Sequence, residues 1–133
     1  MEIKEDLPKF SKQAFDLNTW KLRSSGFVRE PKDLGYNDLL TLPKVSLTDD
    51  FTCLEGWQVK GVVWEGVKLS NVLVLLGLKP ETRFIRLASG DFSVVLTLER
   101  AMEATTILAL RKGGVPLDEY HGGPVRLVLH VQE

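Results

Sequence analysis

The apolar residues of this chain occur in short runs, which glycine, proline and charged residues separate from one another. The longest run, VLVLLGL at 72–78, is far shorter than the ~20 apolar residues that a membrane-spanning helix needs. Short runs bounded by turn residues are typical of short strands and short helices. The chain is therefore expected to build its core from many small elements.

Alternating apolar residues predict strands, and the positions of capping residues predict helices. Three short helices are expected: 36–42 with Asn37 as its cap, 72–76 closed by Gly77, and a helix capped by Thr97 that runs to about 104. Lys112-Gly113-Gly114-Val115 is typical of a hairpin turn, because both glycines accept a positive φ. A first strand is expected to begin near residue 20. Six further strands are expected at 45–53, 58–64, 83–88, 92–96, 106–110 and 125–131. These elements predict an α+β fold with mixed sheets, richer in strand than in helix.

Length and charge exclude several classes of protein. The 133 residues predict one domain over 1–133, with 1–16 as a charged lead-in segment. The net charge of −1 gives no strong field for nucleic acid or for an anionic membrane, so neither is expected as a partner. The N-terminus has no apolar core of the kind that export signals carry, which predicts a cytoplasmic protein.

Cys53 is the only cysteine, in the stretch FTCLEGW at 51–57. Its thiol could fill space in the core, act as a nucleophile with His121 or His130 as the base, or bind a metal. A tetrahedral zinc site is not expected, because the chain offers one cysteine and two histidines without the spacing of zinc ligands. His130 is interpreted as a residue of the last strand.

A second candidate site lies near the C-terminus, in the sequence His121-Gly122-Gly123-Pro124-Val125-Arg126. Two glycines and a proline after a histidine produce a turn with bare backbone, which a ligand can approach closely. The guanidinium of Arg126 suits a phosphate or carboxylate. Taken alone, the stretch is equally compatible with a structural turn.

The two stretches occur in an order that resembles the molybdopterin-binding domain of the sulfite oxidase family. That family shows a cysteine followed by Gly-Trp, then Trp-x-Gly-Val-x-Leu before a short helix, and here these are Cys53, Gly56-Trp57 and residues 64–69. The later features are Asp91-Phe92, Leu108-Ala109, Gly-x-Pro-Leu at 114–117 and His-Gly-x-Pro-x-Arg at 121–126. The resemblance covers roughly residues 17–131 and implies the fold of that domain.

The resemblance also implies a cofactor and the residues that hold it. The cofactor would be molybdenum-molybdopterin, with the thiolate of Cys53 as the protein ligand of the metal and as the catalytic residue. Gly56, Trp57 and Gly122 would line the cofactor, His121 would hydrogen-bond the pterin, and Arg126 would meet its polar edge or its phosphate. The implied activity is a two-electron transfer of an oxygen atom to or from a small-molecule substrate, with a separate electron-transfer protein as a possible partner.

The chain departs from the family at three places. Sulfite oxidases carry an arginine soon after the cysteine, whereas residues 54–58 read LEGWQ, so sulfite is not expected as the substrate. Family members also carry a Lys- and Trp-bearing segment after the last strand, and histidine or arginine contributions from an N-terminal segment, and neither is evident here. Two alternatives therefore stand beside an enzyme: a non-catalytic molybdopterin-binding or carrier module, and a degenerate scaffold of the same fold.

Overall fold

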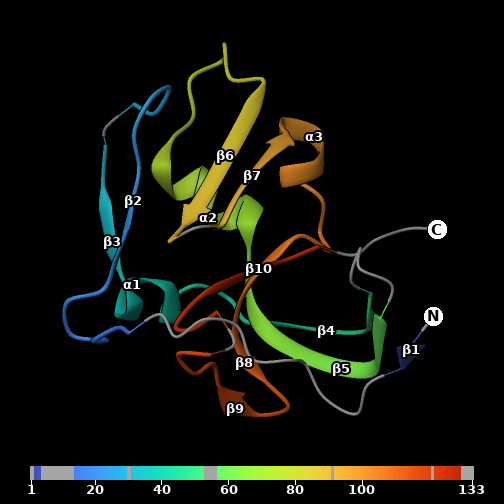
Figure 1. The fold of residues 1–133 in the computed structure, drawn as a ribbon. Coiled ribbons are helices and arrows are strands. Elements are labelled where there is room, and N and C mark those ends of the chain that lie inside the picture. The colour runs from blue at the N-terminus through green and yellow to red at the C-terminus, as the bar shows by residue number, and fades with distance from the viewer. Residues whose placement is uncertain are drawn as a thin grey trace.

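The computed structural model describes residues 2–3, 14–29, 31–52, 57–90, 92–120 and 122–129. Within these ranges the chain forms three short helices and ten strands, which confirms the predicted α+β class (Figure 1). In the order of the chain, the strands are β1 (Glu2–Ile3), β2 (Lys21–Arg23), β3 (Asp33–Gly35), β4 (Val45–Thr52), β5 (Trp57–Lys68), β6 (Phe84–Ser89), β7 (Phe92–Thr97), β8 (Ile107–Lys112), β9 (Val115–Pro116) and β10 (Arg126–Val128). The helices are α1 (Tyr36–Leu40), α2 (Leu69–Leu76) and α3 (Leu98–Ala101).

The main sheet has six strands and is organised around β5. Strands β1, β5, β8 and β10 follow one another across the sheet, β4 pairs with β5, and β9 pairs with β8. The β1–β5 pair is parallel and the other pairs are antiparallel, which makes the sheet mixed, as predicted. At twelve residues β5 is longer than the predicted strand at 58–64, because its second half continues along β8 to Lys68.

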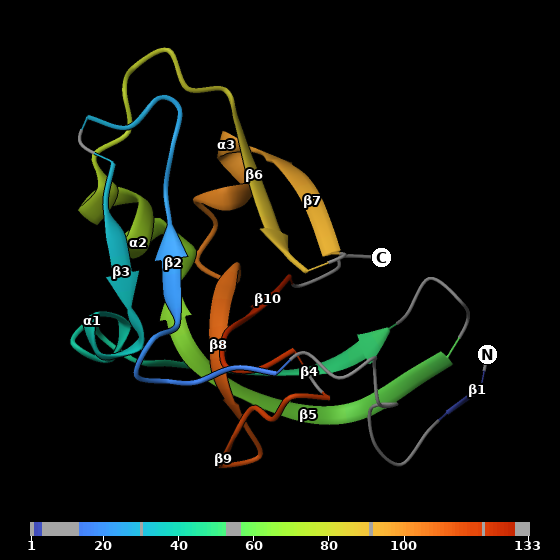
Figure 2. The same ribbon diagram turned by 60° about the vertical axis from the view of Figure 1, so that its left-hand side comes forward.

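Two separate antiparallel ribbons, β2–β3 and β6–β7, stand on one side of the main sheet (Figure 2). Figure 1 shows α2 next to both ribbons, above the end of β5 from which it continues. The buried residues of α2 are Leu69, Val72, Leu73 and Leu76. They belong to a cluster that also contains residues of β3, α1, β7 and β8. The ribbons and the sheet therefore share one core through α2.

Strand β8 has a buried residue on each face of the main sheet. Leu108 and Leu110 belong to the cluster around α2, whereas Ile107 and Ala109 belong to a second cluster with Trp64. This alternation is the period of two that a strand gives its side chains. The sheet is thus covered by apolar residues on both faces, with α2 on one face only.

Several local predictions are confirmed, and one cap is wrong. Gly77 closes α2 in the left-handed conformation with φ 73°, and Thr97 caps α3 by accepting a hydrogen bond from the Arg100 backbone N–H at 3.2 Å. Gly113 and Gly114 both have positive φ in the turn between β8 and β9. The N-cap of α1 is Gly35, not Asn37, and the carboxylate of Asp38 accepts a hydrogen bond from the Gly35 N–H at 2.7 Å. A downstream carboxylate therefore secures the start of this helix in place of the predicted amide.

Candidate functional site

The sequence-predicted site residues fall at two places in the fold. Strand β4 ends at Thr52 and β5 begins at Trp57, so Cys53 and Gly56 belong to the connection between these strands and lie outside the described residues. His121 also lies outside them, whereas Gly122 and Arg126 are described. For Trp57 the structure gives the backbone, which pairs with Glu2 of β1.

Gly122 and Arg126 are brought together by the turn that leads into β10. Gly122 has φ 82°, and a Cβ atom added there would lie 3.1 Å from Cδ of Arg126. Gly123 has no room for a side chain either, because its Cβ would come closer than 3.0 Å to the carbonyl oxygens of Leu117 and Asp118. The peptide bond between Gly123 and Pro124 is cis. The glycines of this motif are therefore required by close approach as well as by backbone conformation.

The side chain of Arg126 lies on the face of the main sheet that carries Trp64. In the register of the sheet, Arg126 is opposite Ala109, and Ala109 is opposite Gly66. These two small residues leave space across the strands, and the guanidinium lies 5.3 Å from the centre of the Trp64 ring. Trp64 is 1% exposed and belongs to the core. A cation over an indole face is attracted by the ring quadrupole, so Trp64 helps to fix the position of the arginine.

Arg126 is half-buried, and its Nη1 atom is buried. A guanidinium keeps its charge in proteins and is the side chain best suited to bidentate recognition of phosphate. This buried cation adjoins a turn whose backbone carries no side chains at two successive positions, Gly122 and Gly123. The guanidinium of Arg126 suits an anionic ligand, whereas the Cβ sides of Gly122 and Gly123 are occupied by atoms of the chain itself.

The predicted metal ligand Cys53 lies outside the described residues, so the described part of the predicted site is its Arg126 end. Among the described residues there is no group of three or more His, Cys, Asp or Glu side chains that could hold a metal.

The comparison with protein families settles the class. The model of the oxidoreductase molybdopterin binding domain matches residues 9–132. The chain belongs to this family. The resemblance seen in the sequence is thus confirmed, and so is molybdenum-molybdopterin as the cofactor of the family. The chemistry of Gly122, Gly123 and Arg126 fits such a cofactor, whose phosphate is anionic.

The relatives of this molybdopterin-binding domain carry the names of several different oxidoreductases. The chain is 30% identical over 112 residues to the uncharacterized oxidoreductase YuiH of Bacillus subtilis, covering 84% of this chain and 57% of that protein. It is 26% identical to the sulfite oxidase of Arabidopsis thaliana, over 85% of this chain and 38% of that protein. It is also 26% identical to the catalytic subunit of the protein-methionine-sulfoxide reductase MsrP of Campylobacter jejuni, over 88% of this chain and 45% of that protein. The chain thus spans about half the length of these relatives, or less.

A solved structure shows the same fold. The sulfane dehydrogenase SoxCD from Paracoccus pantotrophus superposes with a TM-score of 0.79 and 24% identity, over 89% of this chain and 35% of that chain. At this identity the likeness concerns the fold alone, and it confirms the predicted architecture of the molybdopterin-binding domain.

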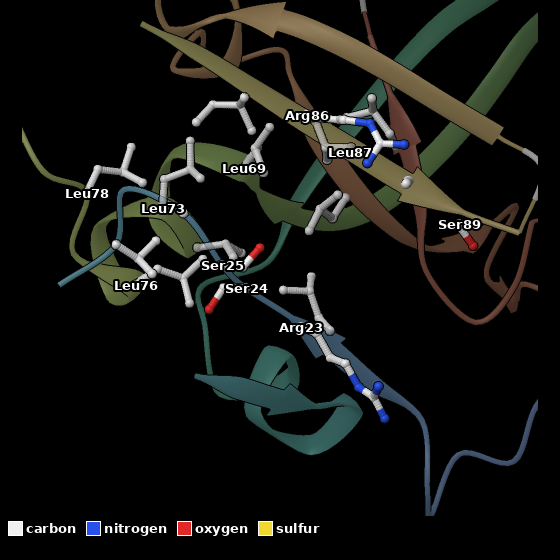
Figure 3. A pocket seen from close by; sticks show the side chains of 18 of the residues that line it. Arg23, Ser24, Ser25, Leu69, Leu73, Leu76, Leu78, Arg86, Leu87 and Ser89 are labelled. Carbon is white, nitrogen blue, oxygen red and sulfur yellow. The ribbon is translucent and has the colours of Figure 1, made fainter. Parts of the chain in front are cut away.

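The fold of this domain also forms a cleft that the sequence did not predict. Its volume is about 770 Å³, and it lies between β2 with the loop that follows it, α2 and β6. Figure 3 shows leucines of α2 on one side and Arg86 and Ser89 on the other, with the guanidinium of Arg23 directed away from Arg86. Arg23 and Arg86 come from strands that lie in different ribbons. Arg86 is the one cation of β6 and Arg23 shares β2 with Lys21, and no local pattern in the sequence marks either arginine as part of a site.

Proposed function

We propose that this chain is the cofactor-binding domain of a molybdenum-dependent oxidoreductase, in which Cys53 supplies a thiolate ligand to the metal. When bound, the cofactor would supply two-electron oxygen-atom transfer, and the protein would orient it and exclude competing reactions. The single observation that carries the proposal is a half-buried arginine packed against the glycine turn, at the positions where the family motif places them.

Each proposed residue has a distinct physical role. Arg126, held over Trp64, would neutralise the phosphate end of the cofactor. Gly122 and Gly123 would let the turn close against Arg126 and against the Leu117 and Asp118 carbonyls, which positions the arginine for the cofactor. His121 would hydrogen-bond the pterin, and Gly56 and Trp57 would lie beside it near the metal. The thiolate of Cys53 is a soft, strongly donating ligand that suits a transition metal.

The substrate is proposed to be a small molecule other than sulfite. Residues 54–58 contain no arginine, so the cation that follows the cysteine in sulfite oxidases is missing. We also propose that electrons pass to or from a separate protein, and that the protein acts in the cytoplasm. No described helix is long and apolar enough to cross a membrane.

The metal ligand is tested by metal analysis and X-ray absorption on protein expressed in a host that makes the cofactor. The wild type should hold about one molybdenum per chain, and Cys53→Ser should lose one sulfur from the coordination shell of the metal. Arg126→Gln should lower the molybdenum content, because the buried cation opposite the phosphate is lost. Arg83→Gln, which removes an exposed guanidinium bonded to the carbonyl oxygens of Pro80 and Thr82, is the matched control and should leave the content unchanged.

Wild-type protein without molybdenum, or an unchanged sulfur count in Cys53→Ser, would contradict the proposal. Dye-linked assays with sulfoxides, nitrate and sulfite then separate an enzyme from a carrier module. An enzyme should turn over a sulfoxide or nitrate faster than sulfite, whereas a carrier should bind the metal and turn over none of them.

A further inference from the structure

The side chains of Arg126 and Trp64 meet across the main sheet. Arg126 belongs to β10, Trp64 belongs to β5, and β8 lies between these two strands. Neighbouring strands lie about 4.8 Å apart, so β10 and β5 are separated by roughly 10 Å. The Arg126 guanidinium nevertheless lies 5.3 Å from the centre of the Trp64 ring. The two side chains must therefore meet over β8.

Ala109 of β8 provides the room for this contact. It is 0% exposed and stands directly opposite both Arg126 and Gly66 in the register of the sheet. Residues that are opposite one another in neighbouring strands have their side chains on the same face of the sheet. A methyl group at this position is short, whereas a longer side chain would occupy the space through which the guanidinium reaches the ring.

Gly122 confines the stem of the arginine. A Cβ atom added at Gly122 would lie 3.1 Å from Cδ of Arg126 and 3.3 Å from both its Cβ and its Cγ. The φ of Gly122 is 82°, which residues with a side chain rarely adopt. The glycine therefore allows the stem to pack against the turn that precedes its own strand.

Trp64 is a fixed platform for the charged end of the arginine. The ring is 1% exposed. It packs with the buried apolar residues of its cluster, which are Val62, Ile107, Ala109, Leu117 and Val128. Nη1 of Arg126 is buried as well. Because the indole face attracts the cation and the stem is confined, the fold orders the guanidinium without a ligand.

We propose that Trp64 is a positioning residue for the cofactor: it holds the Arg126 guanidinium in the orientation that receives the anionic end of molybdopterin. The inference rests on the proposed function and adds to it a residue that acts only through the arginine. Since the guanidinium is ordered before the cofactor arrives, binding loses less conformational entropy. A purely structural tryptophan would contribute to stability alone, so experiments can separate the two roles.

NMR of the cofactor-free chain tests whether the guanidinium is held over the ring. Protons above an aromatic ring are shifted upfield, so the Hε and δ protons of Arg126 should be shifted upfield in the wild type. The shift should be kept in part in Trp64→Phe and should vanish in Trp64→Met, whose side chain is similar in size to phenylalanine but has no ring. Gly122→Ala should reduce the shift, because its methyl group meets the stem. Unshifted Arg126 protons in the wild type would overturn the inference.

A double-mutant cycle tests the role in cofactor binding, on protein from a host that makes the cofactor. The measured quantity is the rate at which molybdenum is lost on dialysis. Trp64→Met should raise this rate about threefold to tenfold, as expected for the loss of a partly desolvated cation–π contact. In the Arg126→Gln background the same substitution should have no further effect, because Trp64 acts through the arginine. An equal factor in both backgrounds would show a merely structural effect and would overturn the inference.

Trp20→Met is the matched control. Trp20 is half-buried and packs against the cluster around α2, on the other face of the sheet from Arg126. The control should change neither the Arg126 protons nor the rate of molybdenum loss, and a loss as fast as in Trp64→Met would overturn the inference. Urea unfolding verifies that each variant is folded, and Trp64→Phe takes the place of Trp64→Met in the cycle if the latter does not fold.

The two proposals fail in different ways. Wild-type protein that holds no molybdenum would contradict the proposed function and the inference together. An additive cycle in protein that does hold molybdenum would overturn the inference alone and leave the proposed function standing.

Discussion

At the scale of single residues, the Trp-x-Gly-Val motif of β5 has a structural explanation. Trp64 and Val67 are buried on different faces of the sheet, in different clusters. The register of β5 and β8 shifts between Glu65 and Gly66, which turns the strand between these two residues. A Cβ atom on Gly66 would come closer than 3.0 Å to backbone atoms of Leu108 and Ala109. The glycine is therefore needed for the contact between two strands, whatever the chain binds.

Replacement of Gly66 by alanine should consequently destabilise the fold. Backbone atoms of β8 cannot move aside as a flexible side chain can, so Gly66→Ala should lower the free energy of unfolding by about 1–3 kcal/mol, the usual cost of overpacking. Urea unfolding followed by tryptophan fluorescence measures the change. Glu65→Ala is the control: its carboxylate is 4.0 Å from Arg111 Nε and nearly half exposed, so the change should stay within about 0.5 kcal/mol. Equal stabilities of the two variants would show that β8 yields at this position.

Helix α3 is short and has a side-chain cap at its start. Four residues make less than two turns, too few for a helix to be stable by itself. The Thr97 hydroxyl accepts the Arg100 N–H, and Thr106 donates a hydrogen bond from its hydroxyl to the Arg100 carbonyl at 2.8 Å. Thr97 at the end of β7 and Thr106 just before β8 thus supply side-chain partners for the backbone of this short helix.

Removal of the cap should cost a measurable part of the stability. Thr97→Ala leaves the Arg100 N–H without its acceptor and should lower the free energy of unfolding by about 0.5–2 kcal/mol. Thr97→Ser keeps the hydroxyl oxygen and should retain most of the stability. Urea midpoints of the two variants give the comparison. A serine variant as unstable as the alanine variant would assign the loss to the methyl group in β7 and not to the cap.

Local features of the elements could be predicted from the sequence, because local chemistry determines them. Gly77, Gly113 and Gly114 adopt the positive φ that glycine tolerates, and Thr97 caps as threonine commonly does. The helix α1 begins at Tyr36 as predicted, but its cap was predicted wrongly, because Asp38 reaches back to the Gly35 N–H and replaces a cap from Asn37. Within the described residues the last strand covers Arg126–Val128, and residues 130 and 131 of the predicted strand, including His130, lie outside them.

At the scale of the whole molecule, the family and the spacing of its motifs could be predicted, but the cleft could not. Gly122 and Arg126 are close in sequence, and one turn brings them together. Arg23 and Arg86 are far apart in sequence and belong to different ribbons, so only the packing of both ribbons over α2 places them on one cleft. Nothing in the residues around either arginine carries that information.

Binding of the cofactor at the proposed site should stabilise the whole fold. A ligand that binds only the folded state adds to its stability, by about 2.7 kcal/mol at a hundred times its Kd. Protein from a host that makes molybdopterin should therefore unfold at higher urea concentration than protein from a host that lacks it. The slope of the transition should be the same, because the same surface is exposed on unfolding.

Arg126→Gln provides the internal control for this difference in stability. Its guanidinium is proposed to bind the phosphate of the cofactor. The variant should therefore show a smaller rise of the urea midpoint between the two hosts. Arg23→Gln/Arg86→Gln changes two cations on the other face and should retain the full rise. Identical midpoints for molybdenum-containing and molybdenum-free wild type would mean that the cofactor does not bind the folded domain preferentially. A rise that is lost in the cleft variant and kept in Arg126→Gln would move the cofactor to the other face of the sheet.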